Sequence, residues 1–371
     1  MRVGCPTEIK NHEYRVGLTP ESVAELVADG NQVLVESGAG KGIGASDEVY
    51  REHGADIVAT AKDVFAQAEL IIKVKEPQAS ERAMLRPDQI LYTYLHLAPD
   101  PDQTKDLIAS GAVCIAYETV TSDDGDLPLL KPMSQVAGRL AIQVGAAALQ
   151  KNAGGRGVLL GGVPGVAPAK VIVIGGGDVG YNAALMAVGM QADVTILERD
   201  NSVMERLSAQ FGASARVIRS TPALLDALLR TADMVVGAVL IPGAAAPKLI
   251  TRDMLSIMQK GSVLVDVAID QGGCFETSRP TTHDDPTYEV DGIIHYCVAN
   301  MPGAVARTST YALNAATLVH AKRIARLGWK RALSQDPHLL NGLNVCQGHL
   351  TYQAVGDALG IDTRPPQEML G

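Results

Sequence analysis

Short apolar runs alternate with helix-forming segments along the first third of the chain. Five runs rich in β-branched and aromatic residues predict buried strands, at residues 3–5, 32–36, 70–74, 89–94 and 112–117. Between the first two runs, Thr19 is a suitable N-cap for a helix that begins at Pro20, and Gly30 lies beyond its end. Because strands and helices alternate, this part of the chain is expected to form a parallel α/β sheet.

A second series of apolar runs occupies residues 170–300. These runs predict six strands, near residues 171–174, 193–197, 216–218, 234–239, 262–267 and 293–298. An alanine-rich helix is predicted ahead of them, from residue 136 to about residue 151. Ser134 would cap this helix after a turn bracketed by Pro128 and Pro132.

The chain is again helical in pattern from about residue 309 to residue 328. No further sheet is expected in this tail, which is therefore predicted to pack back on the first domain. The resulting fold class is α/β, with two Rossmann-like domains built on doubly wound parallel sheets. A nucleotide-binding domain of residues 129–306 would be inserted into a discontinuous substrate domain of residues 1–128 and 307–371, with the site in the cleft between them.

A glycine turn follows the strand predicted at residues 171–174. Gly175, Gly177 and Gly180 form a GxGxxG pattern that leads into a helix-forming segment. Glycines at these positions allow a tight turn and let a pyrophosphate approach the free N–H groups at the helix N-terminus. Taken alone, the pattern also fits a glycine-rich turn that binds no ligand.

Glu198 favours the ligand-binding interpretation. It follows the next predicted strand, 23 residues after Gly175, where a carboxylate accepts hydrogen bonds from an adenosine ribose. Arg199 and Arg206 could suit a ribose 2′-phosphate, but Glu198 would repel that phosphate. We therefore predict NAD rather than NADP as the cofactor. A second glycine-rich stretch, at residues 38–44, is interpreted as a loop because no Gly-Lys-Ser/Thr closes a P-loop.

Five polar residues lie at or near the carboxyl ends of predicted strands, where ligands of open α/β sheets bind. They are Arg15, Lys75, His96, Asp270 and Asn300. Taken singly, each residue also has a structural interpretation. Arg15 and Lys75 could be surface charges, and His96 could be a partly buried histidine. Asp270 could cap a turn, and Asn300 could form an Asx turn. Together they favour one site, because the cations can hold a carboxylate, the imidazole can exchange a proton and the aspartate can orient water.

Composition narrows the class of protein. The 371 residues are 47% hydrophobic and 20% charged, as in soluble globular proteins, and are enough for two domains. A net charge of −9 argues against nucleic acid or an anionic membrane as a partner, and no apolar run reaches the roughly 20 residues that span a bilayer. The five scattered cysteines and the absence of an HExxH motif indicate a reducing cytoplasm and no metal site.

Eight short motifs spread over the chain are specific in combination. They read PTEIKN at 6–11, YRV at 14–16, KVKEP at 73–77, YLHLA at 94–98, MSQVAGR at 133–139, GGRGVLLGGVP at 154–164, AIDQGGC at 268–274 and VANMP at 298–302. With these motifs the chain resembles the alanine dehydrogenase family over essentially its full length. The related NAD-binding component of proton-pumping transhydrogenase shares the fold and the Gly-Gly-Arg-Gly stretch, but it matches less well around His96 and Asp270.

The resemblance implies reversible, NAD-dependent oxidative deamination of L-alanine to pyruvate and ammonium. It implies that Arg15 and Lys75 hold the substrate carboxylate, that His96 and Asp270 carry the proton transfers, and that Asn300 and Met301 line the pocket. The alternatives are a hydride-transfer subunit of a transhydrogenase and a non-catalytic dinucleotide-binding module.

The resemblance also implies a set of cofactor-binding positions. They are Ser134, Gly175, Gly177, Asp178, Val179, Gly180, Glu198, Ser220, Val239, Leu240, Val267, Ala268, Ile269, Asp270, Arg279, Val298, Ala299, Asn300 and Met301. The chain departs from the family at two positions that bear on NAD affinity and on the preference over NADP. Glu198 stands where aspartate is common, and Val203 stands where a basic residue is frequent. Family members are commonly homohexamers, so we expect an oligomer.

Overall fold

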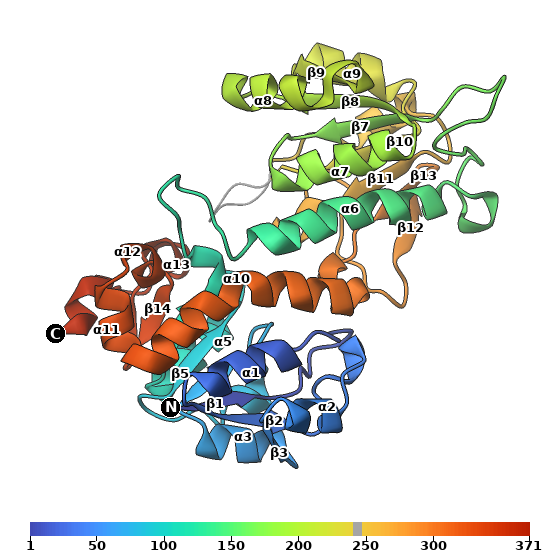
Figure 1. The fold of residues 1–371 in the computed structure, drawn as a ribbon. Helices are drawn as coiled ribbons and strands as arrows, with labels where there is room; N and C mark the ends of the chain where they lie inside the picture. The colour runs from blue at the N-terminus through green and yellow to red at the C-terminus, as the bar shows by residue number, and fades with distance from the viewer. Residues whose placement is uncertain (240–246) are drawn as a thin grey trace. The chain divides into compact units, whose positions relative to one another are not determined.

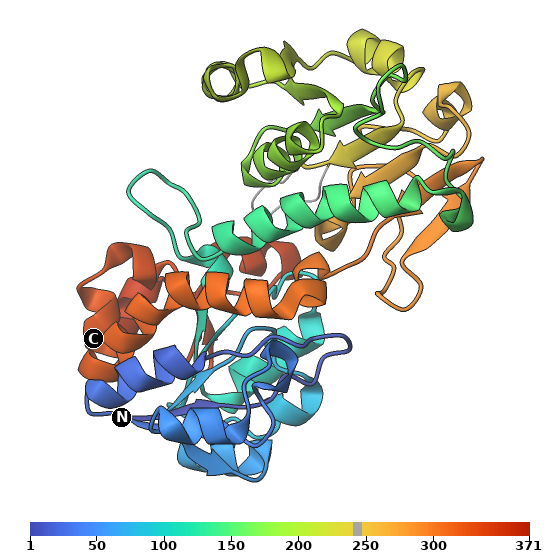
Figure 2. The same cartoon turned by 45° about the vertical axis from the view of Figure 1, so that its right-hand side comes forward.

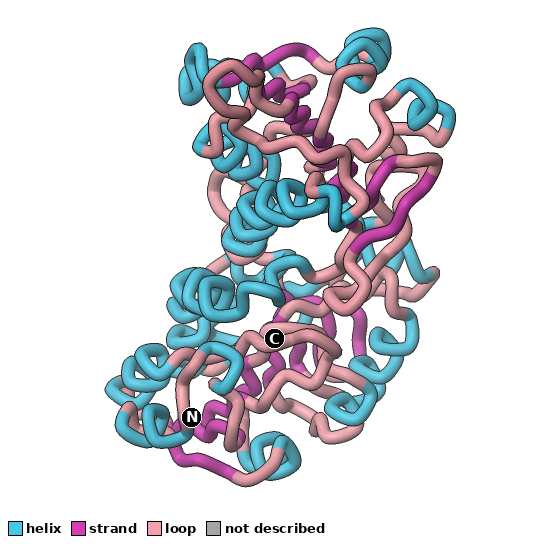
Figure 3. The backbone as a smooth tube through the Cα atoms, turned by 90° about the vertical axis from the view of Figure 1, so that its right-hand side faces the viewer, coloured by secondary structure: helices cyan, strands magenta, loops and turns pink. Residues whose placement is uncertain are grey.

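The computed structural model of the chain describes residues 1–239 and 247–371. The chain forms two compact units. The first unit contains Met1–Met133 and Gly303–Gly371, and the second contains Ser134–Pro302. In each unit strands run through the middle and helices lie outside them (Figure 3). The predicted α/β fold class with two Rossmann-like sheets is confirmed.

The first unit is built on an eight-stranded sheet in the order β15-β14-β6-β5-β4-β1-β2-β3. Its first six strands in the chain are mutually parallel. The strand bounds are β1 Arg2–Cys5, β2 Gln32–Glu36, β3 Asp56–Val58, β4 Leu70–Ile72, β5 Ile90–Thr93, β6 Val113–Ala116, β14 Leu343–Cys346 and β15 His349–Leu350. The strand order reverses between β1 and β4, and open α/β sheets bind ligands at such a point.

Helices cover both faces of this sheet. Their bounds are α1 Pro20–Ala28, α2 Asp47–Glu52, α3 Ala61–Gln67, α4 Ala79–Arg82, α5 Pro101–Ser110, α10 Ala306–Leu327, α11 Trp329–Ser334, α12 Pro337–Leu340 and α13 Gln353–Leu359. Helix α1 begins as predicted, with Pro20 at its first position and the Thr19 side chain accepting from the Ser22 N–H. Figure 1 shows α1 and α10 on one face of the sheet and α3 on the other. Residues of α3, α5 and α13 share one apolar core with the strands.

The second unit is built on a seven-stranded sheet in the order β12-β13-β11-β10-β7-β8-β9. All its strands are parallel except the edge strand β12. The strand bounds are β7 Lys170–Ile174, β8 Asp193–Glu198, β9 Ala215–Arg219, β10 Met234–Gly237, β11 Val263–Asp266, β12 Thr287–Val290 and β13 Ile293–Tyr296. Numbered along the chain, the six parallel strands of each unit follow the same spatial order, 3-2-1-4-5-6.

Among the described residues, the α-helices beside this sheet are α6 Lys131–Ala148, α7 Asp178–Gly189, α8 Asn201–Phe211 and α9 Pro222–Leu229. Helix α6 runs alongside α7 (Figure 2). The two approach closely at Gly138, where an added Cβ would lie 2.2 Å from the Val179 carbonyl oxygen. Helix α9 shares an apolar core with the sheet through Leu225 and Leu229.

Three predictions about elements are wrong. Helix α6 begins at Lys131, so Ser134 lies inside its first turn and is not the N-cap; Pro132 fits there because the first helical N–H groups have no intrahelical acceptor. The tail adds strands to the first sheet, where β14 pairs antiparallel with β6 and β15 with β14. The short strands β3 and β12 are also absent from the prediction.

All five cysteines are free and buried. Burial raises the pKa of Cys5 to about 12 and those of Cys297 and Cys346 to about 11. These thiols are therefore protonated at neutral pH. Over residues 1–239 and 247–371, the structure contains no helix that is both long and apolar enough to cross a membrane.

Candidate active site

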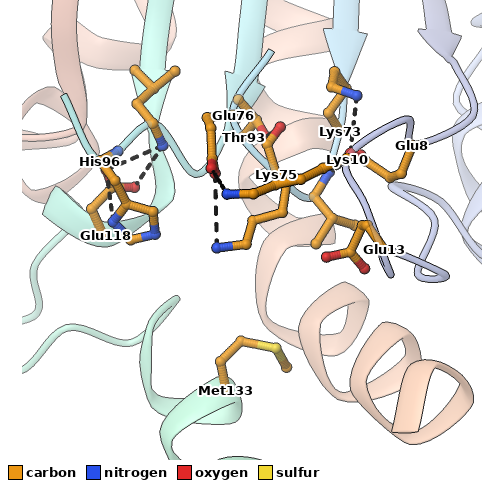
Figure 4. A network of polar contacts seen from close by, with 12 residues as sticks. Glu8, Lys10, Glu13, Lys73, Lys75, Glu76, Thr93, His96, Glu118 and Met133 are labelled. Carbon is orange, nitrogen blue, oxygen red and sulfur yellow. Dashed lines mark hydrogen bonds and ion pairs between the residues drawn. The ribbon is translucent and has the colours of Figure 1, made fainter. Parts of the chain in front are cut away.

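Charged side chains gather at the carboxyl edge of the first sheet, in the segments that follow β1, β4, β5 and β6 (Figure 4). Arg15 is held there by Glu13. Its Nε donates to Oε1 of Glu13 at 2.7 Å and its Nη2 to Oε2 at 2.5 Å, and its Nη1 lies 3.0 Å from the Met133 sulfur. Burial alone would lower the pKa of Arg15, but Glu13 outweighs burial and raises it. Arg15 is thus a buried cation, 2% exposed, and not a surface charge.

Lys75 is the second buried cation at this edge, with 8% exposure. Its Nζ lies 3.8 Å from Oε2 of Glu76, and Lys10 pairs with the other oxygen of the same carboxylate. Burial would raise the pKa of Glu76, but the charges of Lys75, Lys10 and His96 together lower it to about 2. Glu76 is therefore ionised, and the surface-charge interpretation of Lys75 is wrong as well.

An ion-pair triad lies beneath these residues. Lys73 is fully buried, and its Nζ is 3.0 Å from Oε2 of Glu8 and 2.7 Å from Oε1 of Glu81. Burial alone would lower the pKa of Lys73, but the two carboxylates raise it. Glu8 also accepts the Val74 N–H at 2.6 Å, so the triad fixes the backbone that leads to Lys75.

His96 lies in the segment after β5 with its side chain 39% exposed. Its ring stacks on Tyr94, with 5.6 Å between the ring centroids and 5° between the planes. Glu118, from the 3₁₀ turn Tyr117–Thr119 after β6, accepts the His96 N–H at 2.6 Å. The imidazole is accordingly accessible while its backbone is tied to the protein.

The glycine turn after β7 has the geometry of a dinucleotide-binding loop. Gly175 has φ 99°, and a Cβ on Gly180 would lie 1.8 Å from the Gly175 carbonyl oxygen, so both positions need glycine for internal reasons. Gly177 caps α7, and an added Cβ there would meet no atom of the described residues within 4 Å. Within residues 1–239 and 247–371 nothing requires glycine at 177, whereas a phosphate approaching the α7 N-terminus would. The residues present therefore fit a dinucleotide.

Glu198 ends β8 and points at this turn. Its Oε2 accepts the Gly176 N–H at 2.6 Å, and its Oε1 accepts the N–H groups of Arg199 and Asp200 at 2.6 and 3.1 Å. These bonds fix the carboxylate at the end of the strand. An ionised carboxylate can accept about four hydrogen bonds, so the geometry is compatible with a ribose hydroxyl as a further donor.

The other positions implied to bind cofactor lie mostly at the carboxyl edge of the second sheet. Ser220 follows β9 and donates its N–H to the Glu198 carbonyl at 2.7 Å, and Val239 follows β10. Asp178 and Val179 form the first turn of α7, and Ser134 lies in α6. The Arg279 guanidinium stacks 4.0 Å above the Tyr288 ring. Leu240 lies outside the described residues.

The loop after β11 is organised by Asp266, not by Asp270. Asp266 is fully buried and accepts the N–H groups of Ala268 at 3.1 Å and Cys274 at 2.9 Å. It therefore caps the 3₁₀ turn Val267–Gln271, in which Ala268 and Ile269 are buried. The N-cap of this turn is Asp266 and its C-cap is Gly272, so the turn-capping interpretation of Asp270 is wrong. Asp270 is exposed near the end of the turn.

The segment after β13 carries Val298, Ala299, Asn300 and Met301. Asn300 has φ 63°, a conformation that asparagine tolerates better than most residues. Its carbonyl oxygen lies 3.3 Å from Nε2 of His283. Met301 is buried, and Ala299 donates its N–H to Thr281 at 3.2 Å.

The structure thus brings together Arg15, Lys75 and His96 in the first unit. It places Asp270, Asn300 and Met301 in the second unit, at that unit's own carboxyl edge. The meeting of His96 with Asp270 stays a prediction.

Sequence reasoning missed the acidic residues that hold the site, Glu8, Glu13, Glu76, Glu81 and Glu118. Glu8, Glu13 and Glu76 are close in sequence to Arg15 or Lys75, and that proximity was a usable signal. Glu118 follows β6 at the carboxyl edge, so the strand-end rule that selected His96 could have found it.

The chain matches two family descriptions. Residues 4–137 match "Alanine dehydrogenase/PNT, N-terminal domain", and residues 141–353 match "Alanine dehydrogenase/PNT, C-terminal domain". Two similar relatives cover the full length of both chains. The alanine dehydrogenase of Halomonas elongata is 56% identical over 371 residues, and that of Mycobacterium tuberculosis is 50% identical over 370 residues.

The chain is also similar to solved structures. A structure of an L-alanine dehydrogenase superimposes with a TM-score of 0.94 at 48% identity, covering 97% of this chain and 99% of the other. A transhydrogenase from Sinorhizobium meliloti superimposes with a TM-score of 0.81 at 24% identity, covering 95% of this chain and 100% of the other. The second likeness shows the fold alone.

Proposed function

This chain belongs to the alanine dehydrogenase/PNT family, and we propose that it deaminates L-alanine oxidatively and reversibly, with NAD as the hydride acceptor. The balanced reaction converts L-alanine, NAD⁺ and water into pyruvate, ammonium, NADH and a proton. The unit of Met1–Met133 and Gly303–Gly371 would hold the amino acid. The unit of Ser134–Pro302 would hold the dinucleotide.

One observation carries this proposal. Two buried cations, Arg15 and Lys75, lie at the switch point of the first sheet, and the accessible imidazole of His96 lies at the same edge. A small amino or keto acid needs cationic partners for its carboxylate and an acid/base group for the reacting carbon. Glu13 fixes Arg15 in advance through two hydrogen bonds, which lowers the cost of ordering it when substrate binds, and Glu76 balances the charge of Lys75 from 3.8 Å.

Bound NAD would supply the acceptor for the hydride that leaves the substrate Cα. The side chains then have two tasks. Arg15 and Lys75 hold the carboxylate so that the Cα–H bond keeps a fixed direction. His96 and Asp270 manage protons: one removes a proton from the water that attacks the iminium carbon, and one protonates the leaving amine as the carbinolamine collapses. Asn300 and Met301 line the pocket around the substrate.

The choice of NAD rests on Glu198. Its carboxylate is fixed at the end of β8 by three backbone N–H groups, so it cannot easily turn away from a ribose 2′-phosphate. The negative charges of the Glu198 carboxylate and of a 2′-phosphate bound beside it would repel each other. We therefore propose that NADP binds much more weakly than NAD. The contacts to NAD would come from the cofactor-binding positions implied by the family resemblance.

We also propose a homo-oligomer, most simply a hexamer, in the cytoplasm. Common hexamers in the family support the assembly, and five free buried thiols suit a reducing compartment. Light scattering tests the assembly directly. Six chains of 39.0 kDa give about 234 kDa, and a monomeric mass would contradict the proposal.

The experiment that tests the function follows NADH absorbance with L-alanine, L-serine, L-lysine or no amino acid, with NAD and NADP in parallel. NADH formation with L-alanine and NAD at alkaline pH supports the proposal. Binding of NADH without turnover of any amino acid would favour a non-catalytic module. Hydride exchange between two nucleotides without an amino acid would favour the transhydrogenase alternative.

A further inference from the structure

The segment that carries His96 has an unusual backbone. His96 has φ 49°, in the left-handed region that residues other than glycine seldom adopt. Surrounding contacts must over-determine such a conformation for it to persist. The contacts around this residue therefore indicate what keeps the imidazole in place.

Two backbone N–H groups of the segment converge on Glu118. The Leu95 N–H donates to both carboxylate oxygens at 3.2 Å, and the His96 N–H donates to Oε1 at 2.6 Å. On the other side, the Leu95 carbonyl oxygen accepts from Nε2 of Gln103 in α5 at 2.6 Å. Residues 95 and 96 are thus held from two elements, and Glu118 accepts the backbone N–H groups of both residues.

Glu118 does not bond to the imidazole itself. Its Oε1 lies 3.9 Å from Nδ1 of His96, which is beyond hydrogen-bond distance. The other groups that face the imidazole are the Tyr94 ring stacked on it and the Glu76 carboxylate with its partner Lys75. Glu118 therefore acts on His96 through the backbone, and as a nearby negative charge.

We propose that Glu118 is a positioning residue for the acid/base step. Its carboxylate holds residues 95 and 96 in the conformation that points the imidazole at the substrate. This inference rests on the proposed function, because it takes His96 to be the group that exchanges the proton. The mechanism above gives Glu118 no role, and the Glu118 carboxylate contacts residues 95 and 96.

The test is Glu118→Gln in the full-length protein. An amide of the same size has one acceptor oxygen, and its NH₂ group would face an N–H donor. We expect kcat for reductive amination of pyruvate to fall roughly 10- to 100-fold, the usual cost of a misplaced catalytic group. KM for pyruvate and Kd for NADH should change less than about threefold. The solvent deuterium isotope effect on kcat should rise, because proton transfer becomes rate-limiting.

The matched control is Glu69→Gln. Glu69 also accepts a backbone N–H, that of Arg2 at 2.7 Å in the same unit, but it is exposed and precedes β4. This control should keep wild-type kinetics. Glu118→Asp, which retains two acceptor oxygens, should recover part of the lost kcat. Wild-type kcat in Glu118→Gln, or a raised KM with kcat retained, would overturn the inference.

A crystal structure of Glu118→Gln gives a readout that does not depend on activity. We expect residue 96 to leave the left-handed region or its ring to lose the stack on Tyr94. An unchanged loop would overturn the positioning role even if the wild-type protein did not deaminate alanine. If the wild-type protein failed to deaminate alanine while the loop of the variant moved, the proposed function would fail and the structural role of Glu118 would stand.

Discussion

At the scale of single residues, the first-unit site consists of cations that each have a carboxylate partner. Arg15 has Glu13, Lys75 has Glu76, and Lys73 has Glu8 and Glu81. A buried charge without a partner costs several kcal/mol, which explains why every buried cation here comes with an acid. The same pairing fixes the positions of the charges before substrate arrives.

Arg15→Lys should weaken the binding of pyruvate. Lysine cannot reproduce the two-pronged contact with Glu13 and still present a planar donor edge to a carboxylate. We expect KM for pyruvate to rise about tenfold or more, with Kd for NADH unchanged. Steady-state kinetics and NADH fluorescence check this. Arg82→Lys, at the ion pair with the half-exposed Asp106, is the control, and an unaltered pyruvate KM in Arg15→Lys would contradict the assignment.

Glu76 should make the free energy of unfolding depend on pH in the acid range. Its folded pKa of about 2 lies below the ordinary value of 4.5, so it stabilises the folded state above pH 4.5 and loses that contribution as pH falls toward 2. This difference between the two pKa values corresponds to a contribution of roughly 3 kcal/mol to the free energy of unfolding. Urea unfolding of wild type and Glu76→Gln should therefore differ most at neutral pH and converge in acid.

The control for this experiment is Glu48→Gln, which removes an exposed carboxylate paired with Arg51. Exposed pairs of this kind contribute little, so its unfolding should follow the wild type at every pH. A gap between wild type and Glu76→Gln that stayed constant from pH 7 to pH 3 would show that Glu76 is not held in its ionised form.

At the scale of elements, the glycine turn after β7 separates two roles for glycine. Gly180 serves internal packing, since its Cα faces the Gly175 carbonyl, whereas no atom of the described residues lies within 4 Å of a Cβ added at Gly177. One sequence motif therefore combines a structural requirement with a binding requirement.

Gly177→Ala should reduce nucleotide binding without unfolding the protein. A methyl group there meets no atom within 4 Å in the part of the chain that the structure describes, and φ is −66°, so the melting temperature should shift by only about 1–2 °C. Kd for NADH should rise at least about tenfold, because the methyl group occupies the space that a phosphate needs. Gly180→Ala should instead lower the melting temperature. Unchanged NADH affinity in Gly177→Ala would contradict the cofactor site.

The sequence predicted most of the parallel strands, including the edge strand β9, and missed three short edge strands as well as β14 in the tail. Buried strands such as β7 and β11 are continuous apolar runs, and periodicity finds such runs. The edge strands β3, β12 and β15 are short and partly exposed, so no apolar run marks them. The start of α6 was misplaced because Pro132 was interpreted as part of a turn when it occupies the first helical turn.

The candidate site shows the same division. Arg15, Lys75 and His96 could be selected because they follow strands whose carboxyl ends share one edge. The partners Glu13 and Glu76 lie within two residues of their cations, so sequence proximity could have assigned them. The partners of Lys73 and His96 could not be assigned, since the contacts of Lys73 with Glu8 and of His96 with Glu118 join residues from different strand ends. Sequence spacing does not encode which side chains from separate loops will meet.

At the scale of the whole molecule, each unit has its own apolar core. One core joins α3 and α5 to the first sheet, and another joins α9 to the second sheet. Damage to one core should therefore affect the functions of the two units unequally.

Lys73→Met tests this separation. It leaves Glu8 and Glu81 buried without their cation, which costs about 3–5 kcal/mol. For a unit of this size, that loss lowers the melting temperature by about 10 °C. The temperature at which pyruvate turnover is lost should fall by a similar amount, while the temperature at which bound NADH is released should fall less. Lys62→Met, at an exposed position of α3, is the control, and equal shifts of both signals would show that the units unfold together.

The buried cysteines make it possible to measure the opening rate of each unit separately. Cys5, Cys114 and Cys346 belong to the first unit, and Cys274 and Cys297 belong to the second. Because each thiol is inaccessible and protonated in the folded protein, an alkylating reagent can react only after the surrounding structure opens. Mass spectrometry of the alkylated peptides would then give two opening rates from one sample, because the cysteines of each unit report the rate at which that unit opens.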